Sequence, residues 1–229
     1  MDHYFIPAES LSKEFIGKGV PKEKIVPAGI PVRKEFYSRR NRREAKIKLK
    51  IEPENRHILM MCGSMGCGPI KKLAELLMKK IDEKTVLSVI CGTNEKLRAE
   101  LAEKFVDNPK IHIHGFVGNI SDFMDSADIY ITKPGGLSSS EAAAKRLPMV
   151  LIDTVAGCEK FNLEFFVSAG GAVTAETPEE LAKICTDLLN NEAKLKCMAS
   201  ALESTVSENA TEKICRKIKE DFNSWETDM

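Results

Sequence analysis

The chain has 229 residues, of which 43% are hydrophobic, and its 34 basic and 34 acidic side chains balance each other. A chain of this kind can bury a sizeable core, and its charge gives no sign of a nucleic-acid partner. No apolar run approaches the roughly 18–20 residues of a membrane helix, and Asp2 and His3 stand where a signal peptide carries basic residues. These features predict a globular protein in the cytoplasm.

The first 33 residues differ from the pattern that follows them. They contain an apolar strand at 4–6, a short helix near 10–18 and a segment with proline and glycine at 25–33. Because no earlier element can pair with so apolar a strand, we expect a further domain upstream. Residues 1–33 are therefore interpreted as the end of that domain and a linker, and residues 34–229, with the C-terminal helices, as the next domain.

Basic residues concentrate between positions 33 and 50, where nine of them stand against two acidic residues. The simpler interpretation is a solvated helix face. The alternative is attraction to anionic lipid headgroups, which contributes about 1 kcal/mol for each basic residue near such a surface.

Five short apolar runs follow, separated by amphipathic segments, and each predicts a strand. They are Ile58–Met61, Val86–Cys91, Ile111–His114, Ile129–Thr132 and Met149–Ile152. Continuous apolar runs are typical of strands buried on both faces of a parallel sheet. Apolar residues at helical spacing predict a helix over 70–81. Thr177, Pro178 and Glu180 predict the start of another helix, with a capping box. The predicted fold class is α/β, with a doubly wound parallel sheet.

In such a sheet ligands bind at the carboxyl ends of the strands, and here glycine and small polar residues gather in all five loops that follow the runs. These loops cover residues 63–68, 92–94, 115–119, 132–141 and 153–160. The first loop reads G-x-x-G-x-G, and no acidic residue closes the second strand. An NAD enzyme is therefore not expected, because its fingerprint is G-x-G-x-x-G followed by an acidic residue.

The loop from Thr132 to Glu141 reads T-K-P-G-G-L-S-S-S-E and joins a strand to a helix. A helix start offers unpaired N–H groups and about half a positive charge, glycines let a ligand approach, and the three serines can donate to phosphate oxygens. Ser138 and Glu141 also fit a capping box. This segment alone supports both interpretations equally, and the neighbouring glycine-rich loops favour the phosphate site.

Seven cysteines without a C-x-x-C pair predict reduced thiols, mostly in the core, rather than disulfides or a zinc site. His112 and His114 would share one face of a strand, but no third ligand lies near them in the sequence. Strand packing is the better interpretation, and no metal site is predicted.

Three segments carry a family resemblance: A-G-I-P-V-R at 28–33, the turn at 134–142, and G-C-E-K-F-N at 157–162. They resemble the nucleotide-sugar-binding half of two-domain lipid glycosyltransferases, which include monogalactosyldiacylglycerol synthase, processive diacylglycerol glucosyltransferases and the lipid II N-acetylglucosaminyltransferase. The likeness extends from Tyr4 to about Leu189. It implies a Rossmann-like domain of the GT-B type, a UDP-sugar as donor without a further cofactor, and hexose transfer to a lipid such as diacylglycerol. It also implies an N-terminal acceptor domain or separate subunit, and contact with the inner face of the cell membrane.

The resemblance implies a role in donor binding for residues of every loop. The loop with Gly63, Ser64 and Met65 would lie near the donor sugar and phosphates, and Cys158, Glu159 and Asn162 would face the hexose. Relatives usually carry glutamine at the position of Cys158, which leaves the identity of the hexose open. The other implied donor-binding residues are Gly92 and Asn94; Phe116 and Val117 for the uracil; Gly135, Gly136, Ser138, Ser139 and Ser140 for the pyrophosphate; Glu141 for the ribose; and Arg33 for the nucleotide.

Inverting glycosyl transfer needs a base for the acceptor hydroxyl and a stabilised pyrophosphate leaving group. The implied donor loops supply the second, and no Asp-x-Asp motif indicates a tightly held metal ion. No catalytic base is assigned, since sugar contact or loop structure suits Asp153 and Glu159 better. Two alternatives stay open: a relative of UDP-N-acetylglucosamine 2-epimerase, and a non-catalytic nucleotide-sugar-binding subunit that docks through its N-terminal strand and Trp225.

Overall fold

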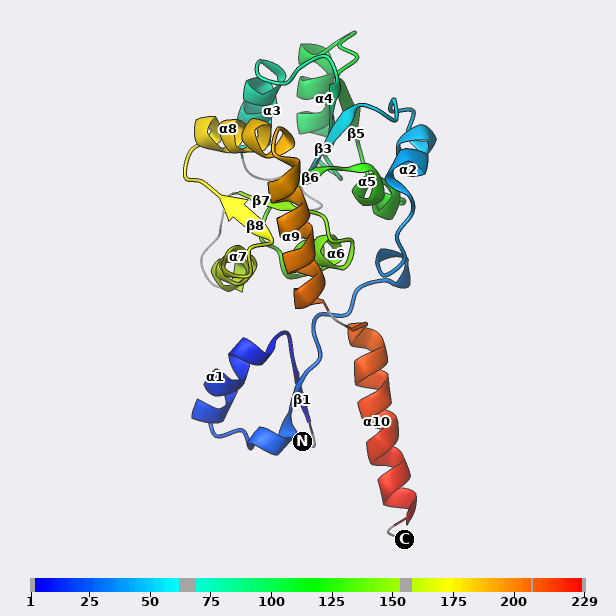
Figure 1. Cartoon of the computed structure of the whole chain (residues 1–229), viewed down its shortest axis with the longest axis vertical. Coiled ribbons are helices and arrows are strands. Elements are labelled where there is room, and N and C mark those ends of the chain that lie inside the picture. The colour runs from blue at the N-terminus through cyan, green and yellow to red at the C-terminus, as the bar shows by residue number, and fades with distance from the viewer. Residues whose placement is uncertain (1–2, 62–68, 153–157, 207, 228–229) are drawn as a thin grey trace. The chain divides into compact units, whose positions relative to one another are not determined.

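The computed structural model describes residues 3–61, 69–152, 158–206 and 208–227. The chain divides into two compact units, one formed by Glu35–Thr205 and the other by Met1–Lys34 together with Val206–Met229 (Figure 1). Among the described residues, no helix is long and apolar enough to cross a membrane.

The larger unit is built on one sheet of six parallel strands. Along the sheet the order is β5-β4-β3-β6-β7-β8, so the strand order reverses direction between β3 and β6. The strands are β3 (Arg56–Met61), β4 (Thr85–Ile90), β5 (Ile111–His114), β6 (Ile129–Thr132), β7 (Met149–Leu151) and β8 (Ala172–Thr174). The five predicted strands and the parallel sheet are confirmed. The sequence missed β8, whose three residues are too few to form a distinct apolar run.

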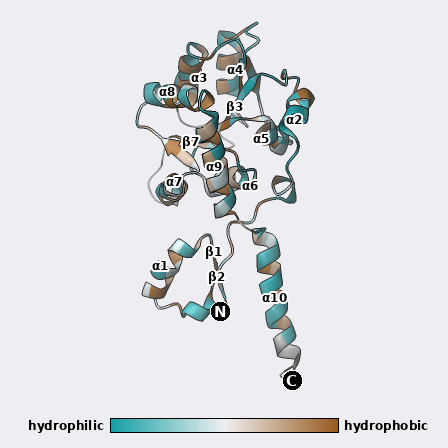
Figure 2. Ribbon diagram, in the orientation of Figure 1, coloured by the Kyte–Doolittle hydropathy of each residue, from teal (hydrophilic) through white to brown (hydrophobic). Residues whose placement is uncertain are grey.

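Helices cover both faces of this sheet, as the doubly wound prediction requires. They are α2 (Arg42–Lys48), α3 (Ile70–Met78), α4 (Glu95–Lys104), α5 (Ile120–Ser126), α6 (Gly136–Ala144), α7 (Cys158–Ser168), α8 (Pro178–Leu189) and α9 (Glu192–Thr205). Thr177 caps α8 in the predicted capping box. In Figure 2 brown, hydrophobic residues colour β8 and parts of α3 and α8, while α2 is largely teal.

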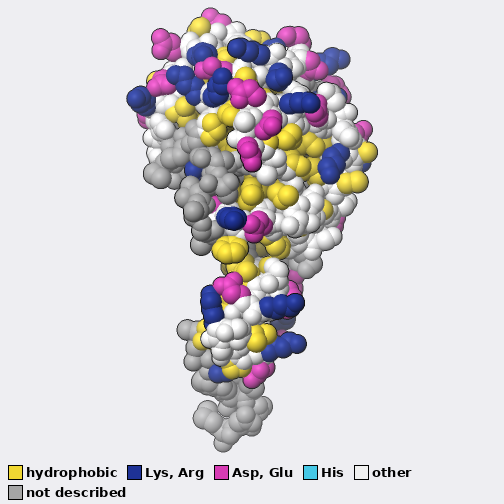
Figure 3. Space-filling view, turned by 90° about the vertical axis from the view of Figure 1, so that its left-hand side faces the viewer, with side chains coloured by type: hydrophobic (Ala, Val, Ile, Leu, Met, Phe, Trp, Pro, Cys, Tyr) yellow, Lys and Arg dark blue, Asp and Glu magenta, His cyan; other side chains and the backbone are white. Residues whose placement is uncertain are grey.

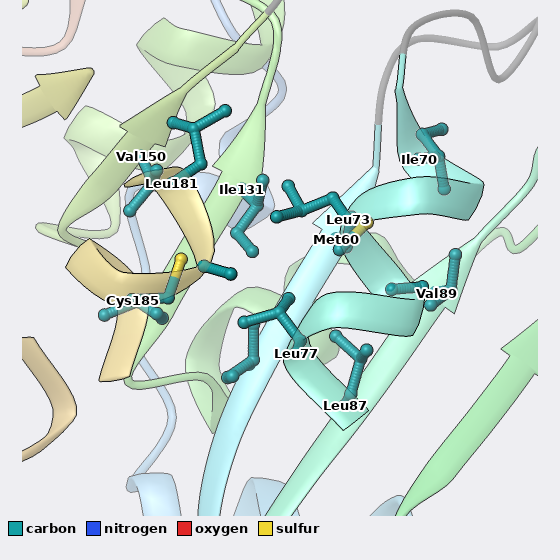
Figure 4. Close-up of a cluster of buried hydrophobic side chains, with 14 of the residues drawn as sticks. Met60, Ile70, Leu73, Leu77, Leu87, Val89, Ile131, Val150, Leu181 and Cys185 are labelled. Atoms are coloured by element: carbon teal, nitrogen blue, oxygen red, sulfur yellow. The ribbon is translucent and has the colours of Figure 1, made fainter. Parts of the chain in front are cut away.

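The main core lies between the sheet and helices α3 and α8. Leu73 and Leu77 of α3 and Cys185 of α8 point towards Met60 and Ile131 of the central strands (Figure 4). All five side chains are fully buried. The predicted apolar stripe of α3 is therefore the surface that packs on the sheet.

On the opposite face of β3, His57 is a fully buried polar residue directly before the apolar run. Its Nδ1 atom lies 2.8 Å from Ser126 Oγ of α5, and its Nε2 atom lies 2.9 Å from Ser88 Oγ of β4. Burial, with smaller effects from the charges of Lys46 and His112, lowers the pKa of His57 to about 3. The ring is therefore neutral and links β3, β4 and α5 through hydroxyl groups.

Acid should weaken the fold through His57. Between pH 6.5 and about 3, His57 binds a proton in the unfolded chain but not in the folded chain. The free energy of unfolding therefore falls as the pH is lowered through that window. Above pH 6.5, His57 does not change the free energy of unfolding with pH. His57→Gln should destabilise the protein at pH 7 by about 1–3 kcal/mol, because the buried hydroxyls of Ser88 and Ser126 lose their hydrogen bonds to the ring. It should also lose less stability than the wild type between pH 7 and pH 4.5. Urea unfolding at several pH values measures both effects, and equal pH slopes would contradict the assignment.

The basic segment before β3 is held by aspartates of the same unit. Asp122 pairs with Arg40 (3.4 Å) and Lys48 (2.6 Å), and Asp128 pairs with Arg42 (2.8 Å) and Lys46 (3.4 Å). The other basic residue of α2, Arg43, pairs with Glu54. Much of the local charge is therefore balanced inside the domain. On the face in Figure 3, basic and acidic side chains are likewise interspersed.

A buried ion pair fixes the start of this segment. Lys145, at the end of α6, places Nζ 2.8 Å from Asp125 Oδ2 of α5, and the two side chains are 1% and 6% exposed. The same ammonium group donates to the carbonyl of Ser38, and Ser121 Oγ donates to the carbonyl of Glu35 at 3.1 Å. Residues 35–38 are thus anchored on α5 and α6.

Lys145→Met should destabilise the larger unit by about 3–5 kcal/mol, because it leaves the Asp125 carboxylate buried without its counter-charge. Lys104→Met is the matched control, since Lys104 pairs with Glu75 at the surface and should cost under about 1 kcal/mol. Denaturant unfolding of both variants measures the difference. Equal stabilities would show that the buried pair is dispensable.

Among its described residues, the smaller unit contains a two-stranded parallel sheet and two α-helices. Strand β1 (Tyr4–Ile6) pairs with β2 (Ile25–Pro27), and the helices are α1 (Ser12–Gly17) and α10 (Ala210–Thr227). The partner of the strand at 4–6 follows it in sequence, and the expectation of a further domain upstream stays a prediction. His3 Nε2 lies 2.7 Å from Asp221 Oδ2 of α10. Contacts group α10 with the first 34 residues, which the sequence did not indicate.

The cysteines divide between core and surface. Cys91 and Cys185 are buried, Cys197 and Cys215 are exposed, and all four are free thiols. The side chains of Cys62, Cys67 and Cys158 lie outside the described residues.

Candidate functional site

The carboxyl ends of β3 and β6 meet where the strand order reverses, and in open α/β sheets this switch point is the usual ligand crevice. The loop after β3, with Gly63, Ser64 and Met65, lies outside the described residues, as do residues 153–157 after β7. The candidate site is therefore described through its other parts: the loops after β4, β5 and β6, and the first turn of α7.

The turn after β6 leads directly into α6. Gly135 is the N-cap, with an extended backbone (φ −73°, ψ 139°), and no side chain of the described residues caps the helix. Since the helix begins at Gly136, Ser138 lies within its first turn. The capping-box interpretation of Ser138 and Glu141 was therefore wrong. The first-turn N–H groups and the positive end of the helix dipole face this turn without a capping side chain.

Two hydroxyl groups beside this turn are buried without a described partner. Thr132 ends β6, Ser139 lies in the first turn of α6, and both side chains are 0% exposed. Neither Oγ1 of Thr132 nor Oγ of Ser139 has a hydrogen-bond partner among the described residues. An unpaired buried hydroxyl costs about 1–3 kcal/mol, so a polar group that contacts it stabilises the site. Ser138, Ser140 and Glu141 are half-buried around them.

Ser139→Ala should leave the stability unchanged or slightly raised, because the hydroxyl that it removes has no partner among the described residues. If that hydroxyl donates to a phosphate, the same variant should bind a nucleoside diphosphate about 3- to 10-fold more weakly. Thermal unfolding and calorimetric titration measure the two effects. A stability loss above about 1 kcal/mol with unchanged ligand binding would assign Ser139 to the fold instead.

Helix α7 is tied to the turn by a side-chain hydrogen bond. Asn162 Nδ2 donates to the carbonyl oxygen of Pro134 at 2.9 Å, and Glu159 lies half-buried in the first turn of α7. The structure therefore brings together the segments at 134–142 and 158–162. Asn162 positions the turn with its amide N–H.

The loops after β4 and β5 lie on the other side of the switch point. Gly92 has a left-handed backbone (φ 59°), and the Asn94 side chain accepts from the Leu97 N–H at 2.9 Å, so it caps α4. Phe116 is 77% exposed and Val117 is half-buried. Asn94 therefore caps a helix, a structural role that the sequence did not predict. Arg33 belongs to the smaller unit, and its contact with the nucleotide stays a prediction.

Sequence reasoning missed one charged pair at this edge. Arg98 Nη1 donates to Glu95 Oε2 at 3.0 Å, and both residues lie on α4. No sequence motif distinguishes these two residues, because charged residues on a helix are usually exposed to solvent and have no further role.

The two histidines of β5, His112 and His114, are partly buried in the fold. Burial lowers the pKa of His112 and, with the charges of His112 and Arg98, the pKa of His114. The His114 ring packs edge-on against Phe123 with centroids 5.0 Å apart. Within the described ranges no group of three His, Cys, Asp or Glu side chains is placed to hold a metal ion.

The strand order and the uncapped helix start at the switch point define the class, a Rossmann-like α/β domain. The model of the family "Glycosyl transferases group 1" matches residues 66–210, and the chain belongs to this family.

Solved structures with this fold come from several enzymes. MurG of Acinetobacter baumannii superposes with a TM-score of 0.64 at 18% identity, over 84% of this chain and 56% of that one. A UDP-N-acetylglucosamine 2-epimerase described as putative, from Listeria monocytogenes, gives 0.71 at 20% identity, over 97% and 60%. The UDP co-structure of MnaA from S. aureus gives 0.69 at 19% identity, over 97% and 61%. At these identities the likeness concerns the fold alone.

Among curated proteins, the processive diacylglycerol beta-glucosyltransferase of Staphylococcus epidermidis ATCC 12228 is 33% identical over 218 residues. The match covers 94% of this chain and 55% of that enzyme. The protein of the same name from S. aureus Newman is 30% identical over 217 residues, with the same coverages. The chain thus spans about half the length of these relatives.

Proposed function

We propose that this chain is the donor-binding part of an inverting glycosyltransferase that moves a hexose from a UDP-sugar to diacylglycerol. The uncapped start of α6 carries the proposal, because it lies at the switch point beside the buried hydroxyls of Thr132 and Ser139. Family membership and the 33% identity to a processive diacylglycerol beta-glucosyltransferase support it.

In this proposal the donor lies along the carboxyl edge of the sheet. The pyrophosphate contacts the turn at Gly135 and Gly136 and the serines of α6, where N–H groups and the helix dipole stabilise the departing UDP. Glu141 accepts from the ribose hydroxyls, and the first turn of α7, with Glu159, faces the hexose. The backbone near Phe116 binds the uracil.

Transfer to an acceptor also needs an acceptor-binding site and a catalytic base, which the described loops are not proposed to supply. The relatives are almost twice as long as the matched region, so we propose that the acceptor and the catalytic base come from an N-terminal domain or a separate subunit. Diacylglycerol resides in membranes, and the proposed working place is therefore the inner membrane surface. Strand β1, which pairs only with β2 among the described residues, and the exposed Ile218 and Phe222 of α10 suit contact with such a partner.

A relative of UDP-N-acetylglucosamine 2-epimerase is the second candidate, because two solved structures that bear this name, one of them as putative, have TM-scores of 0.71 and 0.62. Release of free N-acetylmannosamine from UDP-N-acetylglucosamine would favour it. A binding subunit without catalysis is the third candidate, and a stable complex formed through β1 and α10 that leaves turnover to the partner alone would favour it.

Calorimetric titration with UDP, UDP-glucose, UDP-galactose, UDP-N-acetylglucosamine and NAD tests the proposal. We expect the chain to bind UDP and to prefer one UDP-hexose. Glu141→Gln should weaken UDP binding about 10-fold or more, because a hydrogen bond to a charged carboxylate is lost. Glu164→Gln on the exposed surface of α7 is the matched control and should bind as the wild type does.

Two outcomes would contradict the proposal. One is no binding of any uridine nucleotide, and the other is binding that Glu141→Gln leaves unchanged. Binding of NAD in place of UDP would return the chain to the dehydrogenase class.

A further inference from the structure

Arg98 of α4 lies at the carboxyl ends of β4 and β5, next to the first residue of the loop that follows β5. A Cβ atom placed on Gly115 would lie 3.5 Å from both Cδ and Nη1 of Arg98, and 3.6 Å from Glu95 Oε1. The arginine side chain therefore runs across Gly115, where the chain has no side chain of its own.

The charge of Arg98 affects the pKa values of residues at the ends of both strands. Burial raises the pKa of the Cys91 thiol to about 11, and the Arg98 charge acts against that increase. At His114, burial and His112 lower the pKa, and Arg98 adds to the effect. Cys91 follows β4 and His114 ends β5, so both effects agree with the position of Arg98 above Gly115.

Glu95 holds the guanidinium in place without enclosing it. Their ion pair is 3.0 Å long, and the side chains of Arg98 and Glu95 are 49% and 70% exposed. In the part of the chain that the structure describes, Arg98 forms no other ion pair. About half of the Arg98 side chain is therefore accessible to a ligand.

Arg98 is within reach of a nucleotide bound as proposed above. Neighbouring strands are about 4.8 Å apart, so β4 and β5 lie about 10 and 14 Å from β6, where α6 begins. A uridine that extends from a pyrophosphate at α6 towards β5 covers a similar length. Its base then arrives beside Gly115 and the exposed Phe116.

We propose that the guanidinium plane of Arg98, oriented by Glu95, packs against the face of the pyrimidine base of UDP. A guanidinium is planar and weakly hydrated and stacks well on aromatic rings, and glycine at position 115 leaves room for the contact. This inference rests on the proposed function and adds a specificity residue to the donor site.

Titration of wild type, Arg98→Gln and Lys96→Gln with UDP and with inorganic pyrophosphate tests it. Arg98→Gln should weaken UDP binding about 3- to 30-fold, the range of a cation–π contact, and leave pyrophosphate binding unchanged. Lys96→Gln removes an exposed charge from the same helix and should bind both probes as the wild type does. Arg98→Lys keeps the charge without the plane and should stay weaker than wild type, and Glu95→Gln should show an intermediate loss.

The outcomes separate this inference from the proposed function. UDP binding to Arg98→Gln that equals the wild type overturns the inference alone, and so does full recovery in Arg98→Lys. If Arg98→Gln weakened the binding of UDP and of pyrophosphate equally, Arg98 would contact the phosphates, and this too would overturn the inference. A wild type that binds no UDP overturns the proposed function itself.

Discussion

The structure depends on one constraint, the start of α6 at the point where the strand order reverses. A helix that begins at a glycine without a capping side chain leaves polar N–H groups at the edge of a buried sheet, and such groups need a partner. Two buried hydroxyls beside them have the same requirement. In the proposed function a phosphate group accepts from these N–H groups and also meets the helix dipole. This links an apparent defect of the fold to the function proposed for it.

The rest of the larger unit holds this edge in position through charges as well as apolar packing. The basic segment before β3 is clamped on Asp122 and Asp128, and Lys145 at the far end of α6 is fixed by Asp125. The exposed pairs contribute little each, whereas the buried pair is sensitive to the loss of one partner. The same helix therefore has an uncapped N-terminus and fixes the incoming chain near its C-terminus.

Local patterns predicted most of the fold, because continuous apolar runs and an i, i+3, i+4 stripe report directly on burial. They did not reveal the pairing of β1 with β2, which joins distant residues, or His57, whose buried ring depends on Ser88 and Ser126 from other elements. At the candidate site, the sequence indicated the loops but left the role of Ser138 open until the first residue of α6 was known. Arg98 carries no local signal, since its position over a glycine arises only when α4 folds back beside β5.

Residue-resolved hydrogen exchange with and without UDP is the most direct test of the account. If α6 binds the nucleotide, exchange should slow for the amides of Gly136–Ser138 and of the 115–117 loop, at the carboxyl edge of the sheet. A hollow of about 310 Å³ at the amino edge, lined in part by Arg42, Arg56 and Lys196, serves as an internal comparison and should show no change. Protection at that hollow, or none at the start of α6, would contradict the central claim that α6 binds the nucleotide.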